Sequence, residues 1–461
     1  MSLREDRFFD PDPEQKRMAM SLFASIEKLP IISPHGHVDP TLFSEADYHF
    51  EDPVSLLIKP DHYLIRMLIS QGLTYDEILF GKDPRQTWRL FCDHFYLFRA
   101  TPSGIWLRHS LETVFKVTER LTLETSDRVY DQIQSVLRSP DFTPRKLFSE
   151  FNIEVLATTD GATDKLTHHQ KIRDSGWKGR VIPTFRPDEL TNLLAPGWRQ
   201  KIDLLGEICG IEVSSFSNFI RAIEARREFF RSMGATATDS GVFSMKALRL
   251  SESEAEGIFR HALNGTVSPN EAEAFTAHML MESARMSVED GMVMQVHPGV
   301  YRNHNPEVFD RYGADRGFDI PVRAEFTNNL QPLLKAYGNS PKFKLLLFTL
   351  DETTYTRELA PLAGAYPSVK LGPPWWFNDS LNGMRRYFDQ VVETAGIYNL
   401  SGFNDDTRAF LSIPARHDVW RRAAANWLAN QVLRGLIEED EGYQMARELA
   451  YDLAKKAYNL S

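Results

Sequence analysis

Two histidines stand one residue apart in the stretch PIISPHGHVDP at residues 30–40. If the apolar run before them is a strand, His35 and His37 lie on the same face, because side chains alternate along a strand. Gly36 between them carries no side chain that would crowd the two rings. Two adjacent imidazoles form one edge of a metal site. The pattern alone is more often two unrelated histidines at a strand end, so further ligands must come from elsewhere in the chain.

Two such residues stand at the ends of other apolar runs. His297 ends the run MVMQVH, and Asp406 follows the run NLSGFN. Together with His35 and His37 they can converge on one divalent ion that keeps an open position for water or substrate. Three imidazoles and a carboxylate suit zinc, and they would also accept manganese, iron or cobalt. Taken singly, His297 is explained as a core histidine and Asp406 as a helix N-cap.

The elements that would position these residues are short apolar runs separated by stretches with helical periodicity. We predict eight buried strands, at 30–35, 153–159, 180–185, 245–250, 292–297, 343–350, 368–372 and 399–404. Helices between near-continuous apolar strands indicate a parallel sheet. The pattern predicts an α/β fold, a distorted (β/α)8 barrel of the TIM type. In such barrels the catalytic residues lie at the carboxyl ends of the strands, where the candidate ligands are found.

The chain is longer than a barrel requires. A bare barrel needs about 250 residues, whereas this chain has 461. The widest gap between predicted strands is 40–150, which predicts a large helical insertion after the first strand. A second surplus lies at 187–240, and the segment from 417 on predicts a helical C-terminal tail. No Pro/Gly/Ser-rich linker separates these parts, so we expect a single domain over 1–461.

Composition excludes several classes of partner. The net charge of -10 argues against nucleic acid or an anionic membrane surface as the main partner. Two cysteines, Cys92 and Cys209, lie far apart without a CxxC spacing, which fits a reducing compartment. The start MSLREDRFFDPDPEQ has no apolar core typical of a signal peptide, and no apolar run is long enough to cross a bilayer. We expect a soluble, cytoplasmic protein.

Longer strings carry a family resemblance. The His-x-His pair, a histidine after the fifth strand and an aspartate after the eighth resemble the amidohydrolase superfamily. The chain is similar to the uronate isomerase family in six strings that occur in the expected order: DHYLIR at 61–66, ATTD at 157–160, IPTFRPD at 182–188, QVHPGVYRNHN at 295–305, WWFNDSLNGM at 375–384 and DDTRAFLS at 405–412. Together they span nearly the whole chain.

The resemblance implies an aldose–ketose isomerase of hexuronic acids. Such enzymes interconvert D-glucuronate with D-fructuronate and D-galacturonate with D-tagaturonate. The reaction needs a base near the C5 oxygen for ring opening, and a proton must then move from C2 to C1 through an enediol. The resemblance also implies one divalent metal, zinc in our expectation and not strictly required, held by His35, His37, His297 and Asp406. A homo-oligomer is expected.

The resemblance assigns roles to particular residues. Asp406 is implied to be both a metal ligand and the ring-opening base, and Arg408 is expected to lie beside it and keep it ionised. Either Tyr63 or Arg408 is expected to handle the C2 proton. The implied substrate-binding residues are His62, Arg186, Arg302, Trp375 and Trp376. An arginine suits this task because its planar fork binds a carboxylate through two hydrogen bonds. The tryptophans are equally well explained as core packing.

Some positions depart from the family pattern and leave alternatives open. Gly161 and Ala162 follow Asp160 where Asp-Pro is typical, and FTLDETT replaces the usual Asn-Pro-Arg-Asp at the sixth strand. These loops shape the pocket, so the preferred uronate stays open. A metal-dependent hydrolase of a sugar-acid lactone or amide is the alternative enzyme, and a non-catalytic sugar-acid binding protein is the other. Lys246 and Arg249 flank the predicted fourth strand, which disfavours a two-metal hydrolase.

Overall fold

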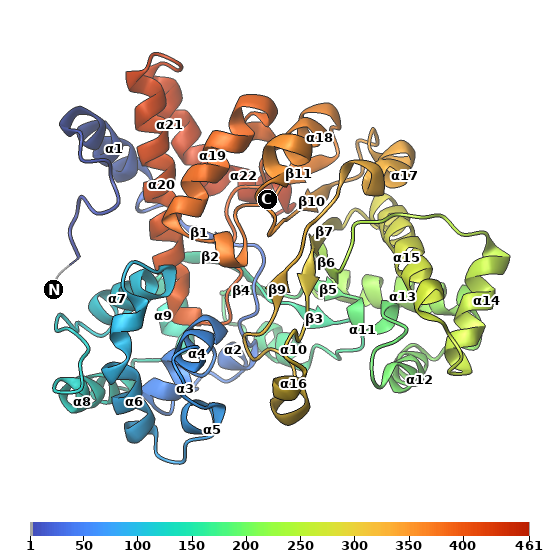
Figure 1. Cartoon of the computed structure of the whole chain (residues 1–461), viewed down its shortest axis with the longest axis horizontal. Helices are drawn as coiled ribbons and strands as arrows, with labels where there is room; N and C mark the ends of the chain where they lie inside the picture. Colours follow the sequence, from blue (N-terminus) through green and yellow to red (C-terminus); the bar gives the residue numbers. More distant parts are fainter. Residues whose placement is uncertain (1–2, 461) are drawn as a thin grey trace.

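The computed structural model describes residues 3–460, and most of its strands are parallel (Figure 1). Strands β1 (Ile31–Ser33), β2 (Ile153–Ala157) and β4 (Arg180–Ile182) pair in that order. A second run has the order β3 (Asp160–Gly161), β5 (Phe185–Arg186), β6 (Ala237–Val242), β7 (Val293–Pro298), β10 (Leu345–Leu347) and β11 (Val369–Leu371). Pairing continues across the breaks between the runs, because Thr158 N donates to Ile182 O at 2.9 Å and Asp160 N to Thr184 O at 3.0 Å. The two runs therefore form one sheet.

Backbone contacts also connect the two edges of this sheet. Leu371 of β11 forms a parallel bridge with Leu400, and Ser401 N donates to Leu371 O at 2.9 Å. On the other edge, His37 N donates to Thr407 O at 2.9 Å. The segment 399–407 thus takes the place of an eighth strand between β11 and β1. The predicted α/β fold, a distorted barrel with helices outside it, is confirmed.

The fourth strand was predicted at the wrong place. The structure has no strand at 245–250, and the fourth strand is β6, at Ala237–Val242. Its sequence ATDSGV contains small and polar residues rather than a continuous apolar run. It is a central strand all the same, because both of its edges are paired, with β5 and with β7. Apolar content alone misses a buried strand that is built from small and polar residues.

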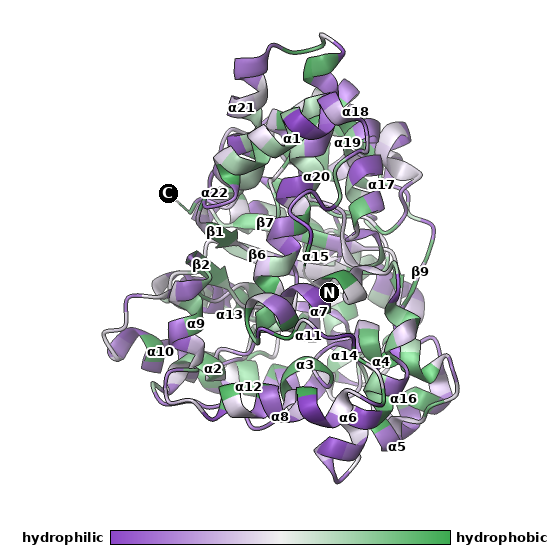
Figure 2. Cartoon of the chain, turned by 90° about the vertical axis from the view of Figure 1, so that its left-hand side faces the viewer, coloured by the Kyte–Doolittle hydropathy of each residue, from purple (hydrophilic) through white to green (hydrophobic). Residues whose placement is uncertain are grey.

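Helices surround the sheet, and several of them begin with a side-chain N-cap. The first is α1 (Pro13–Ile26), and those that follow β3 are α10 (Thr167–Asp174), α11 (Asp188–Thr191), α12 (Trp198–Cys209), α13 (Phe216–Ser232), α14 (Glu252–Leu263), α15 (Pro269–Asp290), α16 (Pro306–Tyr312), α17 (Thr327–Tyr337), α18 (Ala360–Ala365) and α19 (Leu381–Ala395). Ser251 and Ser268 form capping boxes at α14 and α15. Strands β1 and β2 are hydrophobic in Figure 2, whereas outer helices such as α6 and α8 show both hydrophilic and hydrophobic residues, as expected for amphipathic helices.

The predicted insertion between the first two strands is helical. It contains α2 (Thr41–Ser44), α3 (Pro53–Leu57), α4 (His62–Ile69), α5 (Tyr75–Ile78), α6 (Pro84–Asp93), η1 (Phe95–Phe98), α7 (Pro102–Thr113), α8 (Ser126–Leu137) and α9 (Pro144–Glu150). Its buried apolar residues, Trp88 and Phe91 among them, form a cluster of their own that reaches Ile31 and Ile153 of the barrel. Asp61 caps α4 by accepting a hydrogen bond from Tyr63 N at 2.8 Å. This cap fixes where His62 and Tyr63 begin the helix.

A second excursion follows the fifth strand, β7. Residues 299–322 contain the antiparallel pair β8 (Val300–Tyr301) and β9 (Ile320–Pro321), with α16 between them.

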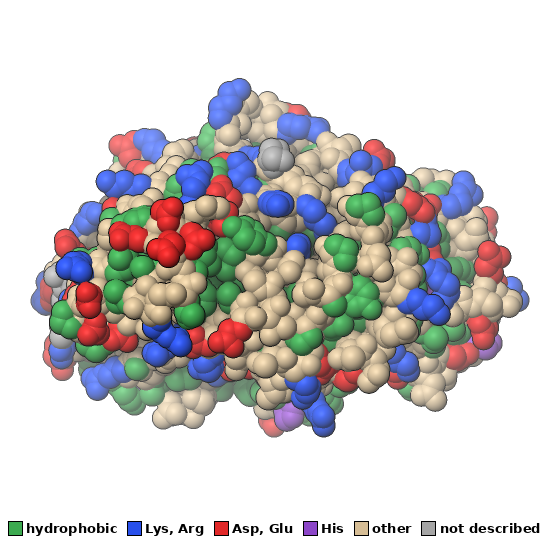
Figure 3. All heavy atoms as spheres, turned by 90° about the horizontal axis from the view of Figure 1, so that it is seen from above, with side chains coloured by type: hydrophobic (Ala, Val, Ile, Leu, Met, Phe, Trp, Pro, Cys, Tyr) green, Lys and Arg blue, Asp and Glu red, His purple; other side chains and the backbone are tan. Residues whose placement is uncertain are grey.

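Short helical turns occur at η2 (Tyr355–Leu359), η3 (Trp376–Asn378), η4 (Ile397–Asn399), η5 (Phe410–Ser412) and η6 (Glu448–Asp452). Among the described residues no helix is long and apolar enough to cross a membrane. The face drawn in Figure 3 carries acidic and basic side chains side by side.

The C-terminal tail is helical, as predicted, and it reaches the barrel interior. It consists of α20 (Ile413–Leu433), α21 (Glu439–Arg447) and α22 (Leu453–Ala457). After α22, the buried Tyr458 hydroxyl donates to Gln295 Oε1 at 2.9 Å and accepts from Asn404 Nδ2 at 3.1 Å. Gln295 lies on β7, so the tail contributes polar contacts to the interior of the sheet.

The approach of this tail to the eighth segment depends on Gly402. Its φ is 74°, and a Cβ there would lie 2.6 Å from Ala454 N in α22. We expect Gly402→Ala to lower the free energy of unfolding by about 1–3 kcal/mol more than Gly435→Ala, because the added methyl group meets backbone. Gly435 is the matched control, since its φ of 68° is similar but nothing lies near its Cβ position. If chemical denaturation gave equal losses of unfolding free energy for the two variants, the close approach of Gly402 to α22 would not affect stability.

Candidate active site

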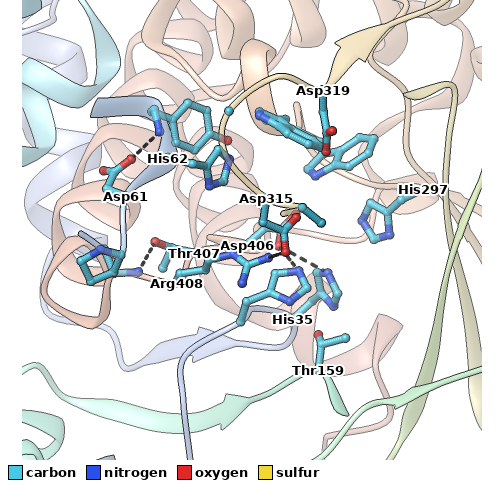
Figure 4. Close-up of a pocket in the computed structure, with 18 of the residues that line it drawn as sticks. His35, Asp61, His62, Thr159, His297, Asp315, Asp319, Asp406, Thr407 and Arg408 are labelled. Carbon is cyan, nitrogen blue, oxygen red and sulfur yellow. Dashed lines mark hydrogen bonds and ion pairs between the residues drawn. The ribbon is translucent and has the colours of Figure 1, made fainter. Parts of the chain in front are cut away.

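One cavity of about 560 Å³ gathers the predicted site residues (Figure 4). All eleven line it: His35, His37, His62, Tyr63, Arg186, His297, Arg302, Trp375, Trp376, Asp406 and Arg408. They lie at the ends of β5, β7 and the eighth segment, just after β1 and β11, or in the insertion and the 299–322 excursion. The cavity is thus at the carboxyl ends of the strands, where barrel enzymes carry their active sites.

The histidines and Asp406 meet as the spacing predicted. Asp406 Oδ1 lies 3.5 Å from His35 Nε2 and 3.2 Å from His37 Nε2. The rings of His35 and His297 are stacked with centroids 4.9 Å apart. Ligand atoms of His35, His297 and Asp406 all lie within 4.8 Å of one another, a spacing that can hold a metal ion. His37 contacts Asp406 but lies outside this group of three.

Asp239, which the sequence analysis missed, orients His297. His297 Nδ1 donates to Asp239 Oδ1 at 2.7 Å, and both side chains are buried. The other ring nitrogen, Nε2, is buried without a hydrogen-bond partner among residues 3–460. A histidine that donates one N–H to a carboxylate and keeps its other nitrogen unprotonated is the usual arrangement of a metal ligand. The residues present therefore fit a divalent ion.

The electrostatics around the candidate metal ligands favour a charged Asp406 carboxylate beside a neutral His35 ring. Burial lowers the pKa of His35 to about 4, so its ring is neutral at physiological pH. Burial also works against the charge of Asp406, but His35 and His37 facing it bring the pKa of Asp406 well below its usual range. Asp406 has a φ of 37°, a left-handed conformation that non-glycine residues rarely adopt. Such backbone strain is concentrated at functional sites.

Arg186 is held between two carboxylates at the cavity wall. Its Nε donates to Asp188 Oδ2 at 2.7 Å, and its Nη1 lies 3.2 Å from Asp239 Oδ2. A Cβ at Gly241 of β6 would lie only 2.6 Å from Arg186 Nη2 and 3.1 Å from Asp188 Oδ2, so a larger residue there would displace the guanidinium from its present place. Burial works against the charge, but Asp188 and Asp239 raise the pKa of Arg186 above its ordinary value. The side chain is a fixed cation.

Helix α4 presents His62 and Tyr63 to the same cavity. Their rings stack with centroids 4.6 Å apart, and His62 also meets Trp376 edge-on at 5.5 Å. Burial, with the nearby charge of Arg408, lowers the pKa of His62 to about 4. Burial raises the pKa of Tyr63 well above its ordinary value, although Arg416 opposes the shift. Tyr63 is therefore a neutral phenol at physiological pH.

Arg408 forms its ion pair with a carboxylate other than Asp406. Its Nη2 pairs with Asp315 Oδ2 at 3.1 Å, a residue of the 299–322 excursion. The groups that hold down the pKa of Asp406 are the histidines. Arg408 lines the cavity nonetheless. The sequence carried no signal for this pairing, because the partners lie 93 positions apart on separate loops.

The remaining predicted residues form walls. Arg302 Nη1 pairs with Asp319 Oδ2 at 2.7 Å, and its guanidinium carbon lies 5.3 Å from the Trp376 ring centroid. Trp375 is buried and meets His297 edge-on at 4.7 Å. Trp375 therefore packs against a candidate ligand and lines the cavity at the same time. Contact of these three side chains with a substrate stays a prediction.

A buried cation, Arg416 of α20, also lines the cavity and was missed. It pairs with Asp379, and its guanidinium carbon lies 3.5 Å from the Trp106 ring centroid.

The sequence argument against a two-metal site depended on Lys246 and Arg249. These two residues pair with Glu273 and Glu282 on α15. That argument used the wrong strand. The true fourth strand, β6, carries Asp239 and no lysine.

Comparisons with known proteins agree on one family. The glucuronate isomerase family profile matches residues 9–458. The uronate isomerase of Nostoc punctiforme is 54% identical over 99% of this chain and 98% of its own length, and that of Brucella canis is 48% identical over 100% of both. The crystal structure of glucuronate isomerase from Caulobacter crescentus superposes with a TM-score of 0.98 at 48% identity, covering 100% of this chain and 97% of that one.

The similarity extends over the cavity as well as the fold, because the matched region includes every residue from β1 to α22. The chain belongs to the glucuronate isomerase family.

Proposed function

We propose that this protein interconverts the aldose and ketose forms of a hexuronic acid, D-glucuronate with D-fructuronate, D-galacturonate with D-tagaturonate, or both. The observation that carries the proposal is the family match over the full length, together with one cavity that holds a charged carboxylate, neutral imidazoles and a fixed guanidinium. Isomerisation of a sugar acid requires these groups and no hydrolytic water.

In this proposal Arg186 binds the substrate carboxylate and so orients the sugar. Its guanidinium is already held by Asp188 and Asp239, so little conformational entropy is lost when a carboxylate binds. His62, Arg302, Trp375 and Trp376 surround the remaining space and would contact the hydroxyl groups and ring faces. The fixed cation would set which end of the sugar faces the histidines.

Asp406 is the proposed ring-opening base. It is ionised, it lies in the cavity, and its Oδ1 accepts no hydrogen bond of good geometry within the described chain. It would take the proton from the ring hydroxyl and return it to the C5 oxygen as the hemiacetal opens. The neutral phenol of Tyr63 suits a proton donor to a substrate oxygen better than a base. Which of Tyr63 and Arg408 moves the proton from C2 to C1 therefore stays open in this proposal, since Arg408 is itself paired with Asp315.

We propose zinc as the metal, held by His35, His297 and Asp406 with His37 beside them. The proposal is supported by the close group of ligand atoms and by the unpartnered Nε2 of His297. When bound, the ion would supply Lewis-acid polarisation of substrate oxygens. The alternative of a sugar-acid hydrolase is not favoured, since relatives at 48–54% identity are uronate isomerases.

Three further expectations belong to the proposal. The chain would act as one domain, because side chains from the insertion, the barrel and α20 line the same cavity. It would work in the cytoplasm, in keeping with the free cysteines Cys92 and Cys209. It would form a homo-oligomer.

The activity is tested by incubating the purified protein with D-glucuronate and with D-galacturonate in D2O. We expect ketose formation with deuterium entering the product at C1, because the enediol is protonated from a group that exchanges with solvent. Proton NMR of the C1 and C2 positions measures both. Absence of turnover on both sugars would overturn the proposed function, and the relative rates identify the preferred substrate.

The base is tested with Asp406→Asn. We expect the isomerisation rate to fall by about 10²–10⁴-fold, the usual contribution of a general base, with an unchanged circular dichroism spectrum. Asp351→Asn is the control, since Asp351 follows β10 but does not line the cavity. A rate for Asp406→Asn close to that of the control would remove Asp406 from its role.

The metal site is tested through Asp239. Asp239→Asn removes the acceptor charge that fixes the His297 ring, and we expect zinc affinity to drop by about 10–100-fold. Asp319→Asn is the matched control, because Asp319 lines the same cavity but pairs with Arg302 instead. Zinc content after dialysis against graded chelator measures the affinity. Equal zinc retention by the two variants would contradict the assigned ligands, and an unchanged rate after full chelation would make the ion dispensable.

A further inference from the structure

A second cavity, of about 640 Å³, lies near the amino ends of the first two strands. Its walls come from the segment between α1 and β1, from α7 and α9, from Asn152 before β2, and from α20. It shares no lining residue with the candidate active site. The proposed isomerase reaction therefore gives it no task.

The wall contains a buried cation that forms no ion pair within residues 3–460, although the charge of Asp418 acts on it from a greater distance. Arg421 of α20 is 5% exposed. Its Nη1 donates to Glu27 O at 2.8 Å, and its Nη2 donates to Leu29 O at 2.9 Å and Pro30 O at 3.0 Å. Its Nε is buried and has no partner in the described part of the chain. Neutral carbonyl groups are its only acceptors there.

The nearby carboxylate is already occupied. Asp418, one turn earlier on α20, pairs with Arg7 at 2.7 Å and with Arg422 at 3.0 Å. Arg421 forms no ion pair with any carboxylate of residues 3–460. Burial lowers the pKa of Arg421 to about 10, which still leaves the guanidinium charged at physiological pH. An unpaired buried charge is costly, and natural proteins usually place a counter-ion beside it.

The rest of the lining is also positive, although the chain as a whole carries a net charge of -10. Besides Arg421, four lysines and arginines line the cavity against three acidic residues. Lys28 and Lys116 lie exposed at its edge, and Lys116 Nζ donates only to the neutral carbonyl of Thr113 at 2.7 Å. A buried N–H donor with flexible ammonium groups at the entrance is an arrangement that attracts a small anion.

We propose that this cavity is a binding site for a small oxyanion, whose oxygen accepts the Nε–H of Arg421 while Lys28 and Lys116 neutralise its outer charge. The shared chemistry is that of phosphate and of short carboxylates. The site is separate from the catalytic cavity and takes a ligand that is not the substrate.

Charge reversal at the edge tests the site without disturbing the core. We expect the double variant Lys28→Glu/Lys116→Glu to bind inorganic phosphate about tenfold more weakly than the wild type, or worse, because two attractions become repulsions. Lys82→Glu/Lys178→Glu is the matched control, since both lysines are exposed, lie outside either cavity and change the net charge equally. Isothermal titration calorimetry with phosphate and, separately, with succinate measures the affinities. The tighter ligand tells whether phosphate or a carboxylate is preferred.

The possible outcomes separate cleanly. Equal affinities of the two double variants would overturn the proposal, because any anion bound by both lies elsewhere, the candidate active site included. No binding heat for the wild type with either anion at millimolar concentration would also overturn it. Arg421→Gln, checked for folding by circular dichroism, is expected to lose binding as well. If that variant does not fold, the comparison of the lysine variants decides.

Discussion

The buried carboxylate of Asp239 connects the two halves of the candidate active site. One oxygen accepts the hydrogen bond of His297 Nδ1 at 2.7 Å, and the other lies 3.2 Å from Arg186 Nη1. The first contact sets which nitrogen of His297 is available to a metal, and the second fixes the cation proposed to bind the substrate carboxylate. Desolvation opposes the charge of Asp239, but Arg186 and His297 together lower its pKa far below the ordinary value. The carboxylate of Asp239 thus orients both the candidate metal ligand His297 and Arg186, the residue proposed to bind the substrate carboxylate.

This arrangement requires a barrel whose strands approach closely at their carboxyl ends. Gly241, two residues after Asp239, leaves room for the Arg186 guanidinium. Gly36 lies beside the backbone of Thr407, where a Cβ would come to 3.5 Å, and His37 N pairs with Thr407 O at the join between β1 and the eighth segment. That join brings Asp406 to the histidines. The hydrogen bond between His37 and Thr407, which closes the sheet, therefore also brings the candidate metal ligands together.

The sequence predicted the barrel, the helical insertion and eleven of the residues that line the cavity. It succeeded where a residue's chemistry follows from a local pattern, as in PHGH and in the arginine of FRPD. It failed at ATDSGV, because this buried strand is built from small and polar residues and lacks the apolar run that marks a buried strand. Because that strand was predicted at the wrong place, Asp239 was not recognised as a site residue. Arg416 was missed for a different reason, since a charged residue in a helix is normally exposed, and this one is buried against Trp106 and Asp379.

The sequence by itself determined the residue types: the imidazoles at 35, 37 and 297, the carboxylate at 406, the cation at 186 and the order of strands that carries them to one end of a barrel. Only the tertiary structure decided the pairing. Arg408 faces Asp315 rather than Asp406, and His297 is oriented by a carboxylate 58 positions earlier in the chain. Charge pairing depends on distances of a few ångströms between loops, and those distances follow from how helices and excursions pack, which no local pattern records.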